Sequence, residues 1–313
     1  MTDSTELHVI IGTGALGRAV MRELVARNKP VRMVNRTGRT DVPDGVEIIA
    51  ADVSNPDDAR RACQGATVVY NCAGAPYDKW PELWPPLMDG VIEGAASANA
   101  KLVFGDNLYM YGPVDGPITE DLPYNATTSK GRVRAQIATA LMDAHARGKV
   151  RATIGRGSDF FGPFVLASAI GERVFRPALT GKAASILGNP DMPHTYTYID
   201  DFGRALVILG EHDEALGQIW HVPNDKTLTT REFLELIYQE AGHPLKMSVM
   251  PNWMMSLLSV FISNLREVKE MMYEFEEPFV VSSDKFEKAF GMKPTPHPEA
   301  IRKTLDWFRQ NPS

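Results

Sequence analysis

A short glycine-rich turn between two apolar segments constrains this chain more than any other feature. Residues 7–11 form an apolar run rich in β-branched side chains, the motif Gly12-x-Gly14-x-x-Gly17 follows, and a helical pattern to about Asn28 leads to a second apolar run at 31–34. This order predicts a βαβ unit. In such a unit the first glycine permits the tight turn, the second lets a phosphate approach the backbone, and the third brings the helix close to the sheet.

The turn and the strand ends beyond it predict a dinucleotide site, with the phosphates at the positive end of the helix. An acidic residue after the second strand would favour NAD, but the chain has Asn35-Arg36, and arginine suits a phosphate group. NADP(H) is therefore expected rather than NAD. The candidate cofactor residues of these segments are Gly12, Thr13, Gly14, Ala15, Leu16, Gly17, Asn35, Arg36, Asp52, Val53, Cys72, Ala73 and Gly74.

Two polar residues near this site allow more than one interpretation. Arg18, in the first turn of the helix, is either a second phosphate ligand or a solvated helix residue. Asp52, at the end of a third strand, either meets the adenine amino group or caps the next helix together with Ser54 and Asn55, which precede Pro56.

Composition excludes several classes of protein. The 313 residues are 44% hydrophobic, enough for a sizeable core, and the net charge of 33 − 39 = −6 argues against a nucleic-acid-binding face. Cys63 and Cys72 have no metal-ligand spacing and are expected to be buried, reduced thiols, so no metal is predicted. Residues 1–6 lack the features of a signal peptide, and no apolar run is long enough to span a bilayer. A cytoplasmic protein without a membrane partner is expected.

Strands and helices alternate through the first half of the chain. Apolar runs at 46–50, 67–72, 101–105 and 150–155 are separated by helical patterns, which predicts an α/β fold with a doubly wound parallel sheet. Beyond Gly155 the alternation ends. Helices are expected there at 202–209, 229–241 and 297–310, and an amphipathic helix around 253–264 either packs in the interior or rests on a membrane surface.

The order of motifs resembles the extended short-chain dehydrogenase/reductases, the NAD-dependent epimerase/dehydratase family. The motifs that carry the resemblance are Gly12-x-Gly14-x-x-Gly17, Asp52-Val53, Asn71-x-Ala73-Gly74, Tyr111-Gly112-Pro113, Lys130 and Tyr198-Ile199-Asp200-Asp201. The resemblance implies a dinucleotide-binding Rossmann domain over 1–157 plus about 200–222, and a smaller, mostly C-terminal substrate domain over 158–199 and 223–313. It also suggests a homodimer.

The family's usual catalytic groups are only partly present. The resemblance implies a lysine that binds the nicotinamide ribose, a tyrosine four residues earlier on the same helix face that moves the proton, and a Ser or Thr after the fifth strand. Lys130 matches the lysine, but Ala126 stands in place of the tyrosine and Asn107 in place of the hydroxyl. Substitute acids are Tyr109, on the same side of an extended segment as Asn107, Tyr124, or Lys130 itself.

Several other side chains are ambiguous between the substrate site and the core. Tyr77, Trp80 and Trp84 either line a substrate mouth or pack a long connection. A group of large apolar side chains either lines the presumed substrate side or fills the interior. His194 and Asp159 either touch the substrate or are structural. The members of the apolar group are Phe160, Phe161, Trp253, Met254 and Met255.

The first functional hypothesis is an NADP(H)-dependent oxidoreductase that acts on a carbonyl or activated double bond of a small, fairly apolar molecule. The missing tyrosine motivates a second hypothesis, a non-catalytic NADP(H)-binding sensor. A sugar-nucleotide epimerase or dehydratase with retained NAD is a third, against which Arg36 argues.

Overall fold

The computed structural model describes residues 6–250 and 269–312, and these divide into two compact units. The first unit comprises residues up to Met110, Lys130–Arg156 and Phe202–Trp220, and the second comprises Tyr111–Ser129, Gly157–Asp201 and His221 onward. Residues 111–129, which the sequence analysis places in the dinucleotide-binding domain, cluster with the second unit. The predicted helix around 253–264 and the side chains of Trp253, Met254 and Met255 lie outside the described residues.

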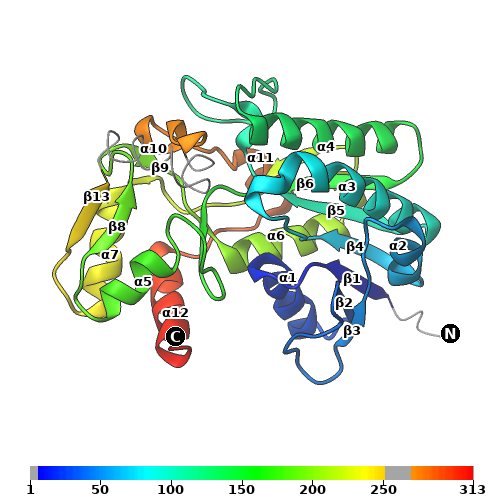
Figure 1. The fold of residues 1–313 in the computed structure, drawn as a ribbon, viewed down its shortest axis with the longest axis horizontal. Helices are drawn as coiled ribbons and strands as arrows, with labels where there is room; N and C mark the ends of the chain where they lie inside the picture. Colours follow the sequence, from blue (N-terminus) through cyan, green and yellow to red (C-terminus); the bar gives the residue numbers. More distant parts are fainter. Residues whose placement is uncertain (1–5, 251–268, 313) are drawn as a thin grey trace. The chain divides into compact units, whose positions relative to one another are not determined.

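A seven-stranded sheet forms the centre of the first unit (Figure 1). Its strand order is β11-β6-β5-β4-β1-β2-β3, and every neighbouring pair from β6 to β3 is parallel. This confirms the predicted doubly wound sheet. The strands are β1 Leu7–Ile11, β2 Val31–Asn35, β3 Glu47–Ala50, β4 Ala66–Asn71, β5 Lys101–Asp106, β6 Arg151–Arg156 and β11 Ile219–His221.

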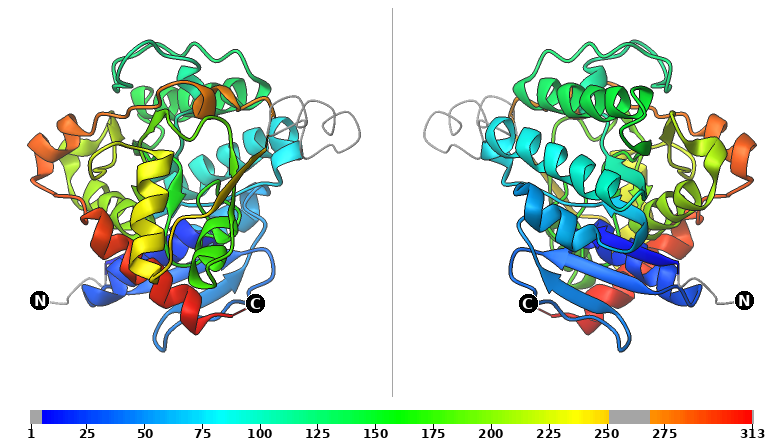
Figure 2. Two further views of the ribbon diagram at one scale, coloured as in Figure 1. Left: turned by 90° about the vertical axis from the view of Figure 1, so that its left-hand side faces the viewer. Right: turned by 90° about the vertical axis from the view of Figure 1, so that its right-hand side faces the viewer.

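Helices cover both faces of this sheet, so most residues of its central strands are buried and apolar. Figures 1 and 2 show α2, α3 and α4 over one face and α1 and α6 against the other. Val9, Val69 and Val103 at the centre of the sheet are completely buried. The helices of this layer system are α1 Ala15–Ala26, α2 Pro56–Cys63, α3 Trp80–Ser97, α4 Ser129–Ala146 and α6 Ile199–Glu211, with 3-10 turns η1 Tyr77–Lys79, η2 Tyr109–Tyr111 and η3 Asp213–Ala215.

The second unit is built from small two-stranded sheets and helices around an aromatic core. Strand β10 pairs with β7, β12 with β9 and β13 with β8. Phe161, Phe175 and Phe233 lie in the core and are fully buried. The elements are β7 Phe160–Phe161, α5 Glu172–Leu179, β8 Ala184–Leu187, β9 Pro193–His194, β10 Thr197–Tyr198, β12 Leu228–Thr229, α7 Thr230–Ala241, β13 Met247–Met250, α10 Tyr273–Glu276, α11 Asp284–Phe290 and α12 His297–Gln310. Over residues 6–250 and 269–312, no helix is long and apolar enough to cross a membrane.

Candidate functional site

The glycine-rich turn of the first unit has two crowded positions and one open position. Gly12 has φ +102°, and a Cβ there would lie 2.6 Å from the Cys72 carbonyl oxygen. A Cβ on Gly17 would lie 2.0 Å from the Gly12 carbonyl oxygen. Around Gly14, by contrast, no atom of the described residues lies within 4 Å of an added Cβ. Gly12 and Gly17 are therefore required by the fold itself, whereas the space beside Gly14 is available to a ligand.

Helix α1, which follows the turn, begins without a side-chain cap among the described residues. Its N-cap is Gly14, and the first turn has no acidic residue. Two helices are capped by side chains: Asn55 accepts from the N–H groups of Asp57 and Asp58 at the start of α2, and Thr229 forms a capping box on α7. Helices α3, α5 and α12 begin, like α1, without a side-chain cap, but among the described helices only α1 follows a glycine-rich turn with open space beside Gly14. The first N–H groups of α1 are thus left to a partner other than a cap, as at a phosphate site.

The segment after β2 is tied to the glycine-rich turn. The Asn35 amide nitrogen donates to the Thr13 hydroxyl, and its oxygen accepts from the N–H groups of Thr37 and Gly38. Arg18 donates to the Thr13 carbonyl at 3.2 Å and to the Asp41 carbonyl at 3.0 Å. Arg18 is therefore not simply solvated, because it holds these two loops together; its role as a second phosphate ligand stays a prediction. Arg36 is exposed at the start of the loop.

The ends of β3 and β4 carry the remaining predicted cofactor residues. Asp52 is exposed and accepts from the N–H and hydroxyl of Ser54, while α2 is capped by Asn55, so the interpretation of Asp52 as the helix cap is wrong. Cys72 and Cys63 are free, buried thiols as predicted. Burial raises the pKa of Cys63 to about 12 and raises that of Cys72 further above its ordinary value, so neither is a reactive thiolate.

Lys130 lies in the first turn of α4, almost fully buried at 2% exposure. Its ammonium nitrogen is 4.5 Å from the centroid of the Tyr77 ring, so Tyr77 and Lys130 form a cation–π contact. Because α4 begins at Ser129, Ala126 precedes the helix. The chain therefore departs from the family arrangement in the residue itself and in the element that carries it.

A buried charge cluster lies beside Lys130 and was missed in the sequence. Arg134, one helical turn after Lys130, donates to the Asp106 carboxylate at 3.1 Å, and its guanidinium carbon lies 4.3 Å and 4.1 Å from the ring centroids of Trp80 and Trp84. Arg156, the register partner of Asp106 on β6, approaches the same carboxylate at 3.5 Å. We call Asp106, Arg134 and Arg156 the strand-end charge cluster. The sequence did carry one signal of this cluster, because each of the adjacent apolar strands β5 and β6 ends in a charged residue, Asp106 and Arg156.

Asn107 and Tyr109 directly follow this cluster. The Asn107 side-chain oxygen accepts from the Tyr109 N–H at 3.3 Å, and residues 109–111 form the 3-10 turn η2. The expectation that Asn107 and Tyr109 share one side of an extended segment is therefore wrong, because the chain turns immediately after β5. Tyr109 is half-buried and stacks on Trp80 with ring centroids 6.0 Å apart. Trp80 and Trp84 are buried, which favours the interpretation that they pack the long connection and do not line a substrate mouth.

Tyr124 belongs to the second unit, where it packs against another aromatic residue. Its ring lies 6.0 Å from that of Tyr111 in an edge-to-face arrangement, and the Tyr111 hydroxyl is 2.9 Å from His221 Nε2. Tyr124 precedes α4, so it does not share a helix with Lys130.

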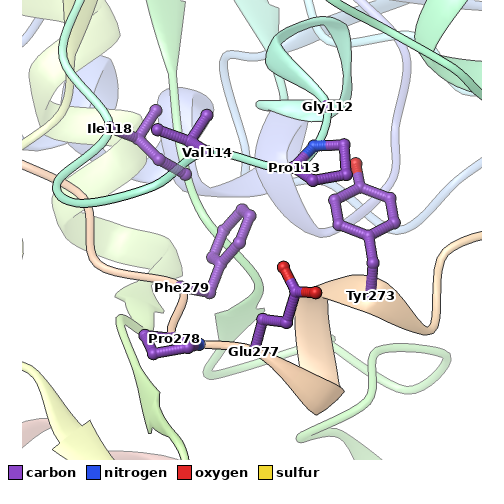
Figure 3. Close-up of a pocket in the computed structure, with 8 residues that line it drawn as sticks. All are labelled: Gly112, Pro113, Val114, Ile118, Tyr273, Glu277, Pro278 and Phe279. Carbon is purple, nitrogen blue, oxygen red and sulfur yellow. The ribbon is translucent and has the colours of Figure 1, made fainter.

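The second unit contains a small pocket with both apolar and polar groups in its lining (Figure 3). The side chains of Phe279, Glu277 and Tyr273 point toward Pro113 and Val114. Phe160 and Phe161, for which the sequence left open a place on the substrate side or in the interior, do not line this pocket, and Phe161 packs in the core. The complete lining is Gly112, Pro113, Val114, Ile118, Tyr273, Glu277, Pro278 and Phe279.

The buried His194 pairs with the partly buried Asp159 in the second unit. His194 Nε2 is 3.0 Å from Asp159 Oδ2, and Nδ1 is 3.1 Å from the Glu274 carbonyl oxygen. The His194 ring is stacked on that of Phe275. Glu274 is itself buried, and its pKa is raised well above the ordinary value by desolvation and by the Asp159 charge. We call Asp159, His194 and Glu274 the second-unit acid cluster.

Comparison with known proteins identifies a family pattern and solved structures of similar fold. The sequence pattern of the NAD dependent epimerase/dehydratase family matches residues 9–222. The structure of dTDP-glucose 4,6-dehydratase from Bacillus anthracis str. Ames in complex with NAD is similar, with a TM-score of 0.79 and 13% identity over 98% of this chain and 97% of that chain. UDP-glucose 4-epimerase from Thermus thermophilus in complex with NAD has a TM-score of 0.78 and 20% identity over 97% and 99%.

A curated relative covers much less of the chain. An uncharacterized oxidoreductase of Saccharomyces cerevisiae is 38% identical over 63 residues, which is 20% of this chain and 20% of that protein. The structural likenesses lie below 25% identity and show the fold alone. The family pattern matches more than half of the chain, so this match is evidence of family membership as well as of the fold.

Proposed function

Because the chain belongs to the NAD-dependent epimerase/dehydratase family, we propose that it is an NADP(H)-dependent oxidoreductase of a small, fairly apolar substrate with a carbonyl or activated double bond. The observation that carries the proposal is the uncapped start of α1 beside the open space at Gly14. Backbone N–H groups and the helix dipole at such a position suit a pyrophosphate. When bound there, the nicotinamide cofactor supplies or accepts a hydride.

The preference for NADP(H) rests on the end of β2. Arg36 follows the strand directly and is exposed, and its guanidinium can pair with a phosphate monoester on the adenosine ribose. Asn35 holds the backbone of this loop through Thr37 and Gly38, so Arg36 emerges from a fixed turn. The two similar structures named above contain NAD instead of NADP(H). The choice between NAD and NADP(H) can be tested directly by titration.

Titration with NADPH and NADH tests the cofactor assignment. Arg36→Ala should weaken NADPH by about 1.5–3 kcal/mol, the range for a hydrogen bond to a charged group, and leave NADH unchanged. Arg147→Ala, an exposed arginine at the end of α4, is the matched control. Gly14→Ala should melt like wild type but lose both cofactors, because its Cβ meets open space in the free protein. Equal loss of NADPH and NADH in Arg36→Ala would contradict the preference.

Turnover separates this proposal from its two rivals. Reduction of small apolar aldehydes and ketones by NADPH supports the oxidoreductase, with Lys130 holding the nicotinamide ribose and the Asn107 amide orienting the substrate oxygen. Tight NADPH binding without turnover favours the sensor, which the alanine at position 126 motivates. Retention of NAD through purification, with turnover of a sugar nucleotide, would favour an epimerase or dehydratase such as the structural relatives named above.

A further inference from the structure

In the first unit, the phenol ring of Tyr77 lies against the buried Lys130 ammonium. We propose that Tyr77 is the proton donor of the reductase reaction, in place of the tyrosine that is absent at position 126. This assignment rests on the proposed oxidoreductase function. Tyr77 enters from the connection after β4, a different element from the one that bears Ala126, and the two residues are far apart in the sequence.

The position of Tyr77 is set by packing. The residue opens the 3-10 turn η1 and is half-buried, so its ring is held while part of it is reachable from solvent. One neighbour is Trp80, whose ring lies 5.0 Å away in an edge-to-face arrangement, and another is the Lys130 ammonium at 4.5 Å. Trp80 is itself buried and lies next to the Arg134 guanidinium. The Tyr77 phenol therefore has a defined position, held by the Trp80 ring and the Lys130 ammonium.

Charge around Tyr77 suits a group that gives up a proton. Lys130 and Arg134 are 2% and 7% exposed, so their positive charges act with little screening by water. Burial lowers the pKa of Arg134, while the Asp106 carboxylate and the phenols of Tyr109 and Tyr77 act in the opposite direction. The Arg134 interaction is mutual, so its charge stabilises the negative charge that remains on Tyr77 after proton transfer. The Lys130 ammonium acts in the same sense through its position, 4.5 Å from the Tyr77 ring centroid. Lys130 fills the same electrostatic role that the resemblance implies, toward a tyrosine on another element.

The step balances as an ordinary carbonyl reduction. The carbonyl carbon gains a hydride with its electron pair from bound NADPH, and the C=O π pair moves to the oxygen. The Tyr77 O–H bond then breaks as its proton joins that oxygen, giving an alcohol and NADP⁺. The resulting phenolate takes a proton from water at the solvent-reachable part of Tyr77. Arg134 acts as a positioning residue, because it packs on Trp80 and approaches the phenols without entering the reaction.

Two tyrosine variants test the assignment with NADPH and a panel of reactive apolar carbonyls led by 4-nitrobenzaldehyde. Tyr77→Phe keeps the ring beneath Lys130 but removes the proton, so kcat should fall by about 10²- to 10⁴-fold while the Kd for NADPH stays at the wild-type value. Tyr109→Phe removes the other half-buried phenol near Arg134 and should lower kcat far less than Tyr77→Phe does; an equal or larger loss in Tyr109→Phe would overturn the assignment of the donor. The wild-type rate should also decline at high pH, where the donor is deprotonated, and the residual rate of Tyr77→Phe should not.

A chemical readout on the cofactor-free protein is independent of turnover. Tetranitromethane nitrates phenolates, so nitration followed by peptide mass spectrometry should modify Tyr77 faster than Tyr109, and Lys130→Met should remove the difference. Equal rates in wild type would overturn the pairing of Tyr77 with Lys130.

The outcomes distinguish the two levels of the proposal. A wild-type protein that reduces the panel while Tyr77→Phe remains equally active overturns the Tyr77 assignment alone. A wild-type protein that binds NADPH and reduces nothing overturns the reductase proposal and this assignment together.

Discussion

Asp106 in the first unit and Glu274 in the second are both buried carboxyl groups, but their partners differ. Asp106 is accompanied by two guanidinium groups, those of Arg134 and Arg156. Glu274 lies near another carboxylate, Asp159, whose own partner is His194. Desolvation is the largest influence on both and raises both pKa values, yet at Asp106 the two cations act against it, whereas at Glu274 the Asp159 charge adds to it.

The difference indicates two uses of a buried acid. The strand-end charge cluster combines one carboxylate with two cations, an arrangement that holds charged side chains beside Lys130. In the second-unit acid cluster, Glu274 is kept in its neutral form by its surroundings. Both partners of His194, a carboxylate and a carbonyl oxygen, are hydrogen-bond acceptors, which suits a ring that donates from both nitrogens. Substitution of each acid by its amide should therefore have opposite consequences near neutral pH.

The largest effect is expected for Asp106→Asn. This change leaves Arg134 and Arg156 buried without a counter-charge, and breaking a buried ion pair in this way costs about 3–5 kcal/mol of unfolding free energy. Urea unfolding followed by tryptophan fluorescence measures it, since Trp80 and Trp84 pack on Arg134. Asp44→Asn, at an exposed loop position, is the matched control. Identical unfolding midpoints for the two variants would show that the strand-end charge cluster does not need its carboxylate.

Glu274→Gln should act in the other direction above acidic pH. The folded state keeps Glu274 protonated beyond its ordinary pKa of 4.5, so its contribution to stability is complete below that value and is lost as the pH rises toward the raised pKa. Over this window the wild-type protein should lose about 1.4 kcal/mol for each pH unit relative to Glu274→Gln. Thermal or urea unfolding between pH 4 and 8 measures the difference. Glu277→Gln, three residues away and exposed, should follow the wild-type pH dependence.

Parallel stability curves for wild type and Glu274→Gln would contradict the assignment of a neutral glutamic acid. A wild-type protein that gains stability relative to Glu274→Gln as the pH rises through 4.5 would contradict it as well, because that result would mean that the ionised form is the one stabilised in the fold.

The sequence predicted the structure of the glycine-rich turn well because the strand, the turn and the helix form one short local pattern there. Gly12, Gly14 and Gly17 lie within six consecutive residues, and the strand before them and helix after them have their own periodicity. The parallel sheet followed from the same alternation. The cap of α2 was less certain, because Asp52 and Asn55 both have the chemistry of a cap and only the backbone geometry selects Asn55.

The two clusters could not be predicted in the same way. Asp106, Arg134 and Arg156 come from three elements, and their contact depends on the register of β5 and β6 and on the rotation of α4. Tyr77 reaches Lys130 only through the path of the connection after β4. The error at Tyr109 has a similar cause, since the pattern after β5 gave no sign that the chain would turn into η2. Distant pairings of this kind leave no periodic signal in a single sequence.

The smallest expected effect concerns the link between Asp159 and Glu274. Asp159→Asn removes a charge that raises the Glu274 pKa but retains an oxygen that can accept from His194 Nε2. The pH window of the fall should therefore be shorter, so the total loss of stability above pH 4.5 should be smaller than in wild type and larger than in Glu274→Gln. A double-mutant cycle at pH 7 should give a coupling of about 0.5–1 kcal/mol, the low end for groups in contact. Additive effects of the two substitutions would mean that Glu274 is neutral through burial alone, and that the contrast with Asp106 depends only on the missing cations.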